Sequence, residues 1–563
     1  MKEFKTIHLK GSQGEMGEQY GKIVLERGGY EESIELYPRI AEALLADANS
    51  QSGAGKLLQT LIKRILHWGA KRLDKQRPAP YRERSSAFVE VLGLPSEVAR
   101  QYLLMDLFQN VIGLAGKLRL GPFARKAGLL PLPACSSLLV WGDASSDGTL
   151  RHARNFDFTA SGVFDAEPAI IFCEPDQGLR YGYVGSFGVD IPGVTGFNEA
   201  GLVVTAHTRF HQDVAFSGAG IVDLCHDIIR RAETLEDVIR IANERPIAST
   251  WGIAVSSGRE GEGIVLETTA KKVALVRHQV NEQFVTATNL YRHPDTQRGQ
   301  LSPSPAFAEY CDGREERLEH MAQEGGLSRD DLEQALGDHC DPFSDAGNRA
   351  AGGVVSQAIT VQSVVFEPEV QNVRVSVGDA PTGWGPYVDA PWNWDAPTGM
   401  QIQSVDETEG RVTSGYAEGD KGAAYKIWLE ATRLDVLHHD PEQTGNLVRQ
   451  AVELDPTDSS YRFMAAMFEL RKGHFAKALE HLEVSISHEK ATFRRAQSLL
   501  WASRAAHQAG DPDKAKAMRA EIRILKDPHI AEFQDLARKE EKKAYSASKL
   551  KKVAYNIMLV DAL

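Results

Sequence analysis

The sequence predicts an α+β protein that ends in an all-helical region. Three successive patterns along the 563 residues indicate this class. From Tyr30 to about Gly128 the pattern is helical, and after Pro133 it changes to short strands broken by turn clusters and helix pairs. Beyond about Glu409 the chain becomes helical and repetitive. Strand runs that alternate with helix pairs, in place of regular βαβ units, favour layered α+β packing.

The first expected elements are a strand and a helix that contains several glycines. Residues 3–10 alternate as a strand, and a turn at residues 11–14 leads into a helix from about Glu15 to Glu26. A glycine costs a helix roughly 1 kcal/mol relative to alanine. Three glycines near one side of this helix therefore predict that another element packs closely there: Gly14, Gly17 and Gly21.

A basic amphipathic helix is predicted at Lys56 to Lys75. Its apolar residues fall on one stripe, and its lysines and arginines lie largely elsewhere. Such a helix can lie on an anionic membrane surface. We favour the alternative, in which it packs on its own protein.

The region after Pro133 is predicted to contain short strands joined as antiparallel hairpins. The expected strands are 136–141, 150–158, 169–173, 180–185, 202–206, 251–256, 263–267, 273–276, 284–288, 358–366 and 373–377. The expected helices are 220–231, 235–243, 314–323 and 329–336. The stretch from Ala380 to Gly399, rich in Pro, Gly and Trp, is predicted to be the irregular end of this region.

The carboxyl-terminal region contains a degenerate repeat. The segment that starts at Gly473 recurs at Gly510, a spacing of 37 residues, near the approximately 34 residues of a tetratricopeptide repeat. Residues 446–525 therefore resemble two such repeats, and a generic helical hairpin bundle is the alternative. The tail from Lys539 to Lys552 alternates in charge and is predicted to be a solvated helix face.

Composition argues against several classes of function. A formal net charge of -13 argues against a protein that binds nucleic acid through an excess of positive charge. No run approaches the roughly 18 to 20 apolar residues of a membrane span, and the first residues lack the apolar core of a signal peptide. Five cysteines without CxxC or metal-finger spacing argue against a disulfide framework and a metal site. We therefore expect a soluble, cytoplasmic protein that needs no cofactor or metal.

Cys135 is the candidate nucleophile. A free cysteine is often a small buried core residue, which is the alternative to a reactive thiol. If the bond between Ala134 and Cys135 is cut, one residue carries both the thiol and a free α-amine. A model α-amine has a pKa of about 7.7 to 8.0, so this amine can take the thiol proton as a general base.

A catalyst of this kind needs a carboxylate, a nearby cation and oxyanion donors. Arg154 and Asp157 lie on the second strand of the hairpin whose first strand begins at Cys135. A turn near Asp147-Gly148 would fold them back beside the thiol. The alternative interpretation is a structural ion pair that closes the mouth of the hairpin.

Five ordered motifs resemble those of the penicillin acyltransferase-like family of autoproteolytic N-terminal nucleophile hydrolases, related to bile-salt hydrolases, penicillin V acylases and acid ceramidase. They extend over roughly residues 5 to 390. The motifs are Leu9-Lys10-Gly11-Ser12 with Gly17 and Gly21; Cys135-Ser136-Ser137 with Arg154-Asn155-Phe156-Asp157; Phe197-Asn198-Glu199-Ala200-Gly201-Leu202; Thr288-Asn289; and Thr360-Val361-Gln362-Ser363-Val364.

This resemblance implies a four-layer αββα fold and a precursor that cleaves itself between Ala134 and Cys135. It implies that Cys135 is both the autocatalytic residue and the nucleophile. Asp157 would anchor the new amine, and Arg154 would polarise the thiol or position the substrate.

The resemblance also implies the oxyanion donors and the division of the chain. Asn289 is the first expected donor. His207 aligns where many relatives have an asparagine, so it is a candidate donor that departs from the family pattern. The cut and the repeat pattern together give the expected domains, which are a small chain at 1–134, a catalytic core at 135–400 and a helical domain at 409–563. The helical domain is an addition to the shorter relatives, so the resemblance does not imply its role.

We therefore expect an amidohydrolase or acyltransferase that acts on a small-molecule linear amide or thioester through an acyl-Cys135 intermediate. Two alternatives remain open. One is a non-catalytic scaffold that binds a protein partner through the helical repeats. The other is a lipid amidase that docks on a membrane surface through residues 56–75.

Overall fold

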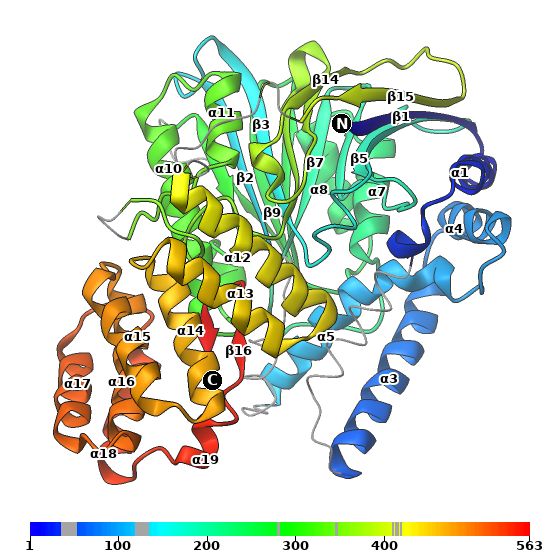
Figure 1. The fold of residues 1–563 in the computed structure, drawn as a ribbon. Coiled ribbons are helices and arrows are strands. Elements are labelled where there is room, and N and C mark those ends of the chain that lie inside the picture. Colours follow the sequence, from blue (N-terminus) through cyan, green and yellow to red (C-terminus); the bar gives the residue numbers. More distant parts are fainter. Residues whose placement is uncertain are drawn as a thin grey trace.

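The computed structural model describes residues 1–34, 53–118, 134–277, 282–343, 347–407, 410, 416 and 419–562. It is a mixed α+β structure, in which two β-sheets and their helices are followed by a run of packed helices (Figure 1). The α+β class and the helical carboxyl-terminal region are therefore confirmed.

Within the described chain, nine strands form the first sheet, in the order β10-β9-β8-β7-β6-β5-β4-β1-β15. Its strands are β1 (Lys2–Gly11), β4 (Pro168–Pro175), β5 (Tyr181–Ser186), β6 (Thr195–Asn198), β7 (Leu202–Thr208), β8 (Trp251–Ser257), β9 (Glu262–Thr268), β10 (Val273–Val276) and β15 (Gly399–Val405). Neighbours are antiparallel except β1 and β4, which run parallel. Most of the sheet is the antiparallel meander that the short connections predicted.

Six of the described strands form the second sheet, in the order β11-β2-β3-β12-β13-β14. Its strands are β2 (Ala134–Gly142), β3 (Gly148–Asp157), β11 (Phe284–Ala287), β12 (Thr360–Glu367), β13 (Asn372–Ser376) and β14 (Tyr387–Pro391). All of these pairs are antiparallel. The hairpin of β2 and β3, which holds the predicted nucleophile, lies inside this sheet and not at its edge.

The two sheets pack against each other through apolar side chains. One cluster joins Phe172 and Phe197 of the first sheet to Val364 and Phe366 of the second. A smaller cluster joins Leu139 of β2, and its neighbours, to strands β8 and β9. Because β2 and β3 are covered on both faces, their residues are almost all buried.

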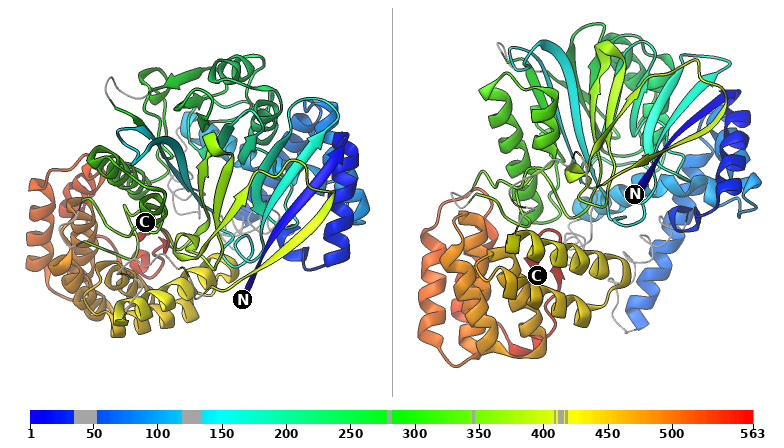
Figure 2. Two further views of the ribbon diagram at one scale, coloured as in Figure 1. Left: turned by 90° about the horizontal axis from the view of Figure 1, so that it is seen from above. Right: turned by 45° about the horizontal axis from the view of Figure 1, so that its top comes forward.

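Each sheet also contacts helices of its own. Helices α7 (Ile221–Arg231) and α8 (Leu235–Asn243) contact strands β6, β7 and β8 of the first sheet. Helices α10 (Pro305–Glu324) and α11 (Arg329–Leu336) contact strands β2, β3, β11 and β12 of the second (Figure 2).

The glycines of the first helix face a neighbouring helix, as predicted. Helix α1 (Gln13–Arg27) packs against α4 (Ala79–Val91). A Cβ at Gly17 would overlap the carbonyl oxygen of Arg84 in α4. Glycine is therefore required there for the close approach of the two backbones.

The basic amphipathic helix is present as α3 (Gly53–Asp74), which contacts α5 (Leu104–Lys117). Three of its described apolar side chains, Leu66, Ala70 and Leu73, are buried in the core beside the first sheet, whereas Trp68 is 53% exposed. The side chains of residues 53–59, 61 and 62 lie outside the described residues. The described helices include none with both the length and the apolar character of a membrane span.

The carboxyl-terminal helices pack on one another in sequence order. They are α12 (Gly419–His438), α13 (Pro441–Leu454), α14 (Ser459–Lys472), α15 (Phe475–His488), α16 (Thr492–Gln508), α17 (Pro512–Ile524) and α18 (Ala531–Lys542). Gly473 and Gly510 follow α14 and α16 with φ of 81° and 93°. The repeated sequence therefore forms the same left-handed turn in two helical hairpins, while the tetratricopeptide assignment stays a prediction.

Three expectations about local structure were wrong. The stretch after Ala380 is not irregular throughout, because it contains β14 and leads into β15. Strand β6 was not predicted, since its four residues are too short for a periodic signal. Helix α10 begins at Pro305 and not near Arg314, because Ser304 caps it by accepting from the Phe307 N–H.

The predicted solvated tail is also partly buried. Glu540 of α18 is 7% exposed and pairs with Arg504 of α16. Leu550 of α19 (Ala547–Leu550) is fully buried, and the chain then forms a short β16–β17 ladder, Tyr555–Asn556 with Asp561–Ala562. The alternating charges of the tail could not predict this burial, because Glu540 is neutralised by Arg504, which lies 36 residues earlier in the sequence.

Candidate active site

The structure places Cys135 near the start of β2, in a hairpin with β3. Across the two strands Ala134 pairs with Asp157, and Cys135 pairs with Phe156. Gly148 begins β3 with a φ of 78°, a conformation that favours glycine. The predicted hairpin therefore forms, and it brings the end of β3 beside the nucleophile. Residues 119–133 lie outside the described residues.

The Cys135 side chain is buried against Arg154. Its exposed fraction is 1%, and Nη2 of Arg154 donates to Sγ over 3.4 Å. The same guanidinium donates to the carbonyl oxygens of Val194 (2.7 Å) and Ala206 (3.0 Å). These bonds orient the guanidinium but do not neutralise it, so the thiol faces a positive charge.

Burial and charge act on the thiol in opposite directions. Burial raises the pKa of Cys135, and the Arg154 guanidinium opposes this rise. Asp157 adds to the rise, whereas Arg314 lowers the pKa again. The thiol of the uncut chain is therefore protonated near neutral pH and must lose its proton during attack.

The backbone of Cys135 is held on both sides. Its N–H donates to Oδ1 of Asn289 over 3.1 Å, and its carbonyl oxygen accepts from Nη1 of Arg314 over 2.7 Å. Nη2 of Arg314 also donates to Oδ1 of Asn289 over 2.7 Å. Nδ2 of Asn289 donates to the Thr208 carbonyl oxygen over 2.8 Å. In the uncut chain Asn289 therefore accepts from the nitrogen of the nucleophile, and its role as an oxyanion donor stays a prediction.

The Asp157 carboxylate is fully buried beside this backbone. Oδ1 accepts from the Thr360 hydroxyl over 2.7 Å, and Oδ2 accepts from the Tyr310 hydroxyl over 3.1 Å. Nη1 of Arg314 lies 3.6 Å from Oδ2. Burial raises the pKa of Asp157, and Arg314 is the main opposing influence. The carboxylate is thus fixed next to the Ala134–Cys135 bond, although its role as amine anchor stays a prediction.

His207 lies near the site but bonds to other side chains. Its Nε2 lies 3.1 Å from the Ser137 hydroxyl and 3.4 Å from the Thr205 hydroxyl. Among the described residues Nδ1 has no hydrogen-bond partner. Burial lowers the pKa of His207 well below its ordinary value, so the imidazole is neutral. A neutral ring can donate one N–H, but no hydrogen bond joins it to Cys135 in the described part of the chain.

Sequence analysis missed two site residues, Tyr310 and Arg314, which α10 places against the hairpin. Arg314 is 0% exposed and Tyr310 is 2% exposed. They are one helical turn apart, so both project from the same face of α10. The spacing of four residues is a signal that the sequence contains, but the predicted helix begins at Arg314 and leaves Tyr310 outside it. Thr360, the other partner of Asp157, lies inside a motif that the resemblance used.

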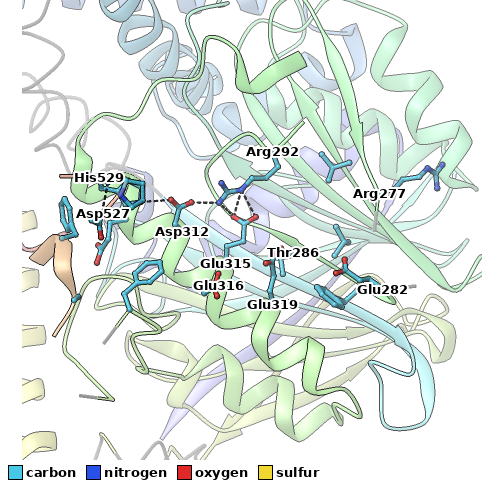
Figure 3. Close-up of a pocket in the computed structure, with 18 residues that line it drawn as sticks. Arg277, Glu282, Thr286, Arg292, Asp312, Glu315, Glu316, Glu319, Asp527 and His529 are labelled. Carbon is cyan, nitrogen blue, oxygen red and sulfur yellow. Dashed lines mark hydrogen bonds and ion pairs between the residues drawn. The ribbon is translucent and has the colours of Figure 1, made fainter. Parts of the chain in front are cut away.

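A cleft of about 640 Å³ lies between β11, α10 and the carboxyl-terminal helices (Figure 3). Asp312, Glu316 and Glu319 line it, and helical geometry puts them on the face of α10 opposite Tyr310 and Arg314. Cys135 is not among the described residues that line this cleft. The cleft is therefore distinct from the thiol site, although both use α10.

The described residues contain no group of three or more His, Cys, Asp or Glu side chains that could hold a metal ion.

Comparison with known proteins finds a family whose model matches part of the chain. Residues 147–380 match the family described as acyl-coenzyme A:6-aminopenicillanic acid acyl-transferase. The match includes Arg154, Asp157, His207 and Asn289, and it begins after Cys135. A search of curated proteins finds no match. Residues 147–380 are therefore similar to the acyl-coenzyme A:6-aminopenicillanic acid acyl-transferase family, and three of the five ordered motifs lie inside this match.

Proposed function

We propose that this protein is a self-processing cysteine amidohydrolase or acyltransferase with Cys135 as its nucleophile. The match of residues 147–380 to the acyl-transferase family supports amidohydrolase or acyltransferase chemistry. The observation that carries the assignment to Cys135 is the Arg154 guanidinium 3.4 Å from its Sγ. A cation at a buried sulfur favours the thiolate during attack, whereas a cysteine with only a packing role does not need one.

We also infer the four-layer αββα arrangement of N-terminal nucleophile hydrolases. Its support is the apolar packing of one sheet on the other, with α7 and α8 against the first and α10 and α11 against the second. The nucleophile strand β2 then lies in an inner layer, where its thiol faces the opposite sheet.

Self-cleavage begins when Sγ of Cys135 attacks the carbonyl carbon of Ala134. The Sγ–C bond forms, the C–N bond breaks and the thiol proton ends on the Cys135 nitrogen, which gives a thioester and a free amine. Water then hydrolyses the thioester, restoring the thiol and leaving a carboxylate on Ala134. The products are residues 1–134 and 135–563, with the helical domain at 409–563 on the larger chain.

After this cut the new α-amine acts as the general base for a linear amide or thioester substrate. It takes the Sγ proton as Sγ attacks the substrate carbonyl. Asp157 anchors the amine, and Arg154 stabilises the developing thiolate. Asn289 and His207 are the candidate oxyanion donors. The acyl-Cys135 intermediate then passes its acyl group to water or to an amine.

A panel of small acyl amides and thioesters tests the activity. Acid quenching during turnover, followed by digestion and mass spectrometry, should find the acyl group on the peptide that contains Cys135. Cys135→Ala should abolish turnover, whereas Cys340→Ser, which changes a more exposed cysteine, should keep it. An acyl adduct on another cysteine, or full turnover by Cys135→Ala, would contradict the proposal.

A further inference from the structure

We propose that the carboxyl-terminal helices are part of the self-cleavage machinery, because they position α10 through Arg494. This inference rests on the proposed function, since it assumes that the chain cuts itself between Ala134 and Cys135. Arg494 acts through α10 and does not touch the reacting atoms, so it is a positioning residue.

Helix α10 faces the nucleophile hairpin on one side and the carboxyl-terminal helices on the other. Tyr310 and Arg314 face the hairpin and bond to Asp157 and to the Cys135 carbonyl oxygen. Glu309, the residue before Tyr310, faces the carboxyl-terminal helices instead. A shift of α10 would therefore disturb the nucleophile directly, because hydrogen bonds join Arg314 to the Cys135 carbonyl oxygen and Tyr310 to Asp157.

Arg494 of α16 holds Glu309 from that other side. Nη2 of Arg494 lies 2.6 Å from Oε2 of Glu309, and Nε donates to Oε1 over 3.2 Å. Arg494 is 2% exposed and Glu309 is 1% exposed. Two-pronged bonding of this kind fixes both distance and orientation. Removing one partner would leave the other as an uncompensated buried charge.

The same guanidinium also fixes the end of the chain. Nη1 of Arg494 donates to the carbonyl oxygens of Leu559 (2.7 Å) and Val560 (2.9 Å). These residues connect the two strands of the β16–β17 ladder. One side chain therefore ties α10, α16 and the last residues together.

Packing places the scissile bond in the same structural unit. Ala134, whose carbonyl carbon would be attacked, belongs to one apolar cluster with Tyr310, Phe493 and Leu559. The carboxyl-terminal helices thus contribute apolar side chains to the surroundings of the residue that is cut. A helical module attached only by a linker would not do this.

Time courses of self-cleavage in the full chain test the proposal. Cell-free synthesis followed by intact-mass measurement gives the rate for wild type, Arg494→Met, Arg494→Lys and Glu309→Gln. Arg504→Met is the matched control, because Arg504 is also buried on α16 and bonds to Glu540 at 2.7 and 3.0 Å without reaching α10. Circular dichroism reports whether each variant is folded.

We expect Arg494→Met to cleave at least about tenfold more slowly, the scale of effect produced by displaced catalytic geometry. Arg494→Lys should recover part of the rate because it keeps a cation beside Glu309. Arg504→Met should stay within about twofold of wild type, since it perturbs the helices but not α10. Slow cleavage by Arg494→Met beside a nearly normal rate for Arg504→Met would distinguish a positioning role from a general loss of stability.

Two results would overturn the inference while leaving the proposed function intact. One is a folded Arg494→Met chain that cleaves at the wild-type rate, and the other is equal slowing in Arg504→Met. If Arg494→Met does not fold, Glu309→Gln replaces it in the test, because glutamine keeps the shape of glutamate and loses only the charge. A folded Glu309→Gln chain that cleaves at the wild-type rate would then overturn the inference, and slow cleavage would support it. A wild-type chain that never cleaves would instead remove the proposed function itself.

Discussion

At the residue scale, the site depends on a buried thiol and the two cations that face it. Cys135 is 1% exposed, and burial raises its pKa while Arg154 and Arg314 lower it. Arg154 comes from the same hairpin, whereas Arg314 comes from α10. Local and distant parts of the chain therefore set the reactivity of one sulfur together.

The contribution of Arg154 can be measured directly. In Arg154→Met the thiol loses the cation that opposes the effect of burial, so its pKa should rise further. The rate at which a small methanethiosulfonate modifies Cys135 at pH 8 should therefore fall at least about tenfold. Arg151→Met is the control, because Arg151 lies on the same strand but pairs with Asp147. Equal rates in wild type and Arg154→Met would contradict this role.

Asp106 gives a prediction about stability that does not involve the nucleophile. Its buried carboxylate accepts from the Ile221 N–H over 3.2 Å, at the start of α7, and from Nε1 of Trp251 over 2.9 Å. Burial raises the pKa of Asp106 to about 7. The folded state thus keeps a proton that the unfolded state loses near pH 4, roughly its ordinary pKa. Its contribution to stability is complete below that pH and is lost as the pH rises towards 7.

Wild type should therefore lose stability relative to Asp106→Asn as the pH rises from 5 to 7. The expected change is about 1.4 kcal/mol per pH unit in the difference between their free energies of unfolding. Urea unfolding of both proteins at pH 5, 6 and 7 measures it. A difference that does not vary with pH would show that the Asp106 pKa is not raised.

The local part of the site could be predicted from the sequence, but the distant part could not. Cys135, Arg154 and Asp157 share one hairpin, and a turn at Asp147-Gly148 is enough to bring them together. Arg314 and Tyr310 reach the same place from a helix more than 150 residues away. Their approach depends on how α10 packs on the sheet, and a periodic pattern does not contain that information.

At the element scale, the contact between α1 and α4 shows how a glycine can set the distance between two helices. Gly17→Ala would place a Cβ against the Arg84 carbonyl oxygen, and overpacking of this kind costs about 1 to 3 kcal/mol. Gly14→Ala is the matched control, because its Cβ would meet only Cβ of Glu83 at 3.7 Å. It should raise stability by up to about 1 kcal/mol through helix propensity. Urea unfolding that ranks the two variants in the reverse order would contradict this packing.

Most elements of the two sheets follow from alternation and turn residues, and the exceptions have physical reasons. Strand β6 has four residues, which is too short for a pattern. Strand β15 is exposed over much of its length and pairs with β1 through residues 399–405. Its place in the sheet depends on backbone pairing with a strand from the other end of the sequence, so its own residues give little signal.

At the scale of the whole molecule, the carboxyl-terminal helices are joined to the two-sheet region by buried charges. Nη1 of Arg349 lies 2.8 Å from Asp341, and Nη2 lies 3.0 Å from Glu489 of the helical region. A second link is the ion pair of His529 with Asp312, at 3.0 Å (Figure 3). The repeat spacing predicted the helical hairpins, but it could not predict these contacts.

Breaking the Arg349 link should destabilise the molecule strongly. Arg349→Met leaves two buried carboxylates without their partner, a change that costs about 3 to 5 kcal/mol. Arg538→Met removes an exposed ion pair with Asp535 and should cost less than about 1 kcal/mol. Urea unfolding followed by circular dichroism compares the two. Similar losses in both variants would mean that the Arg349 link does not stabilise the assembly.

The most direct test of the central claim is the intact mass of the purified full chain. The proposed mechanism predicts two masses from the wild type, one for residues 1–134 and one for residues 135–563, and a single full-length mass from Cys135→Ala. A folded wild-type protein that keeps one full-length mass, the same as Cys135→Ala, would contradict self-processing at Cys135.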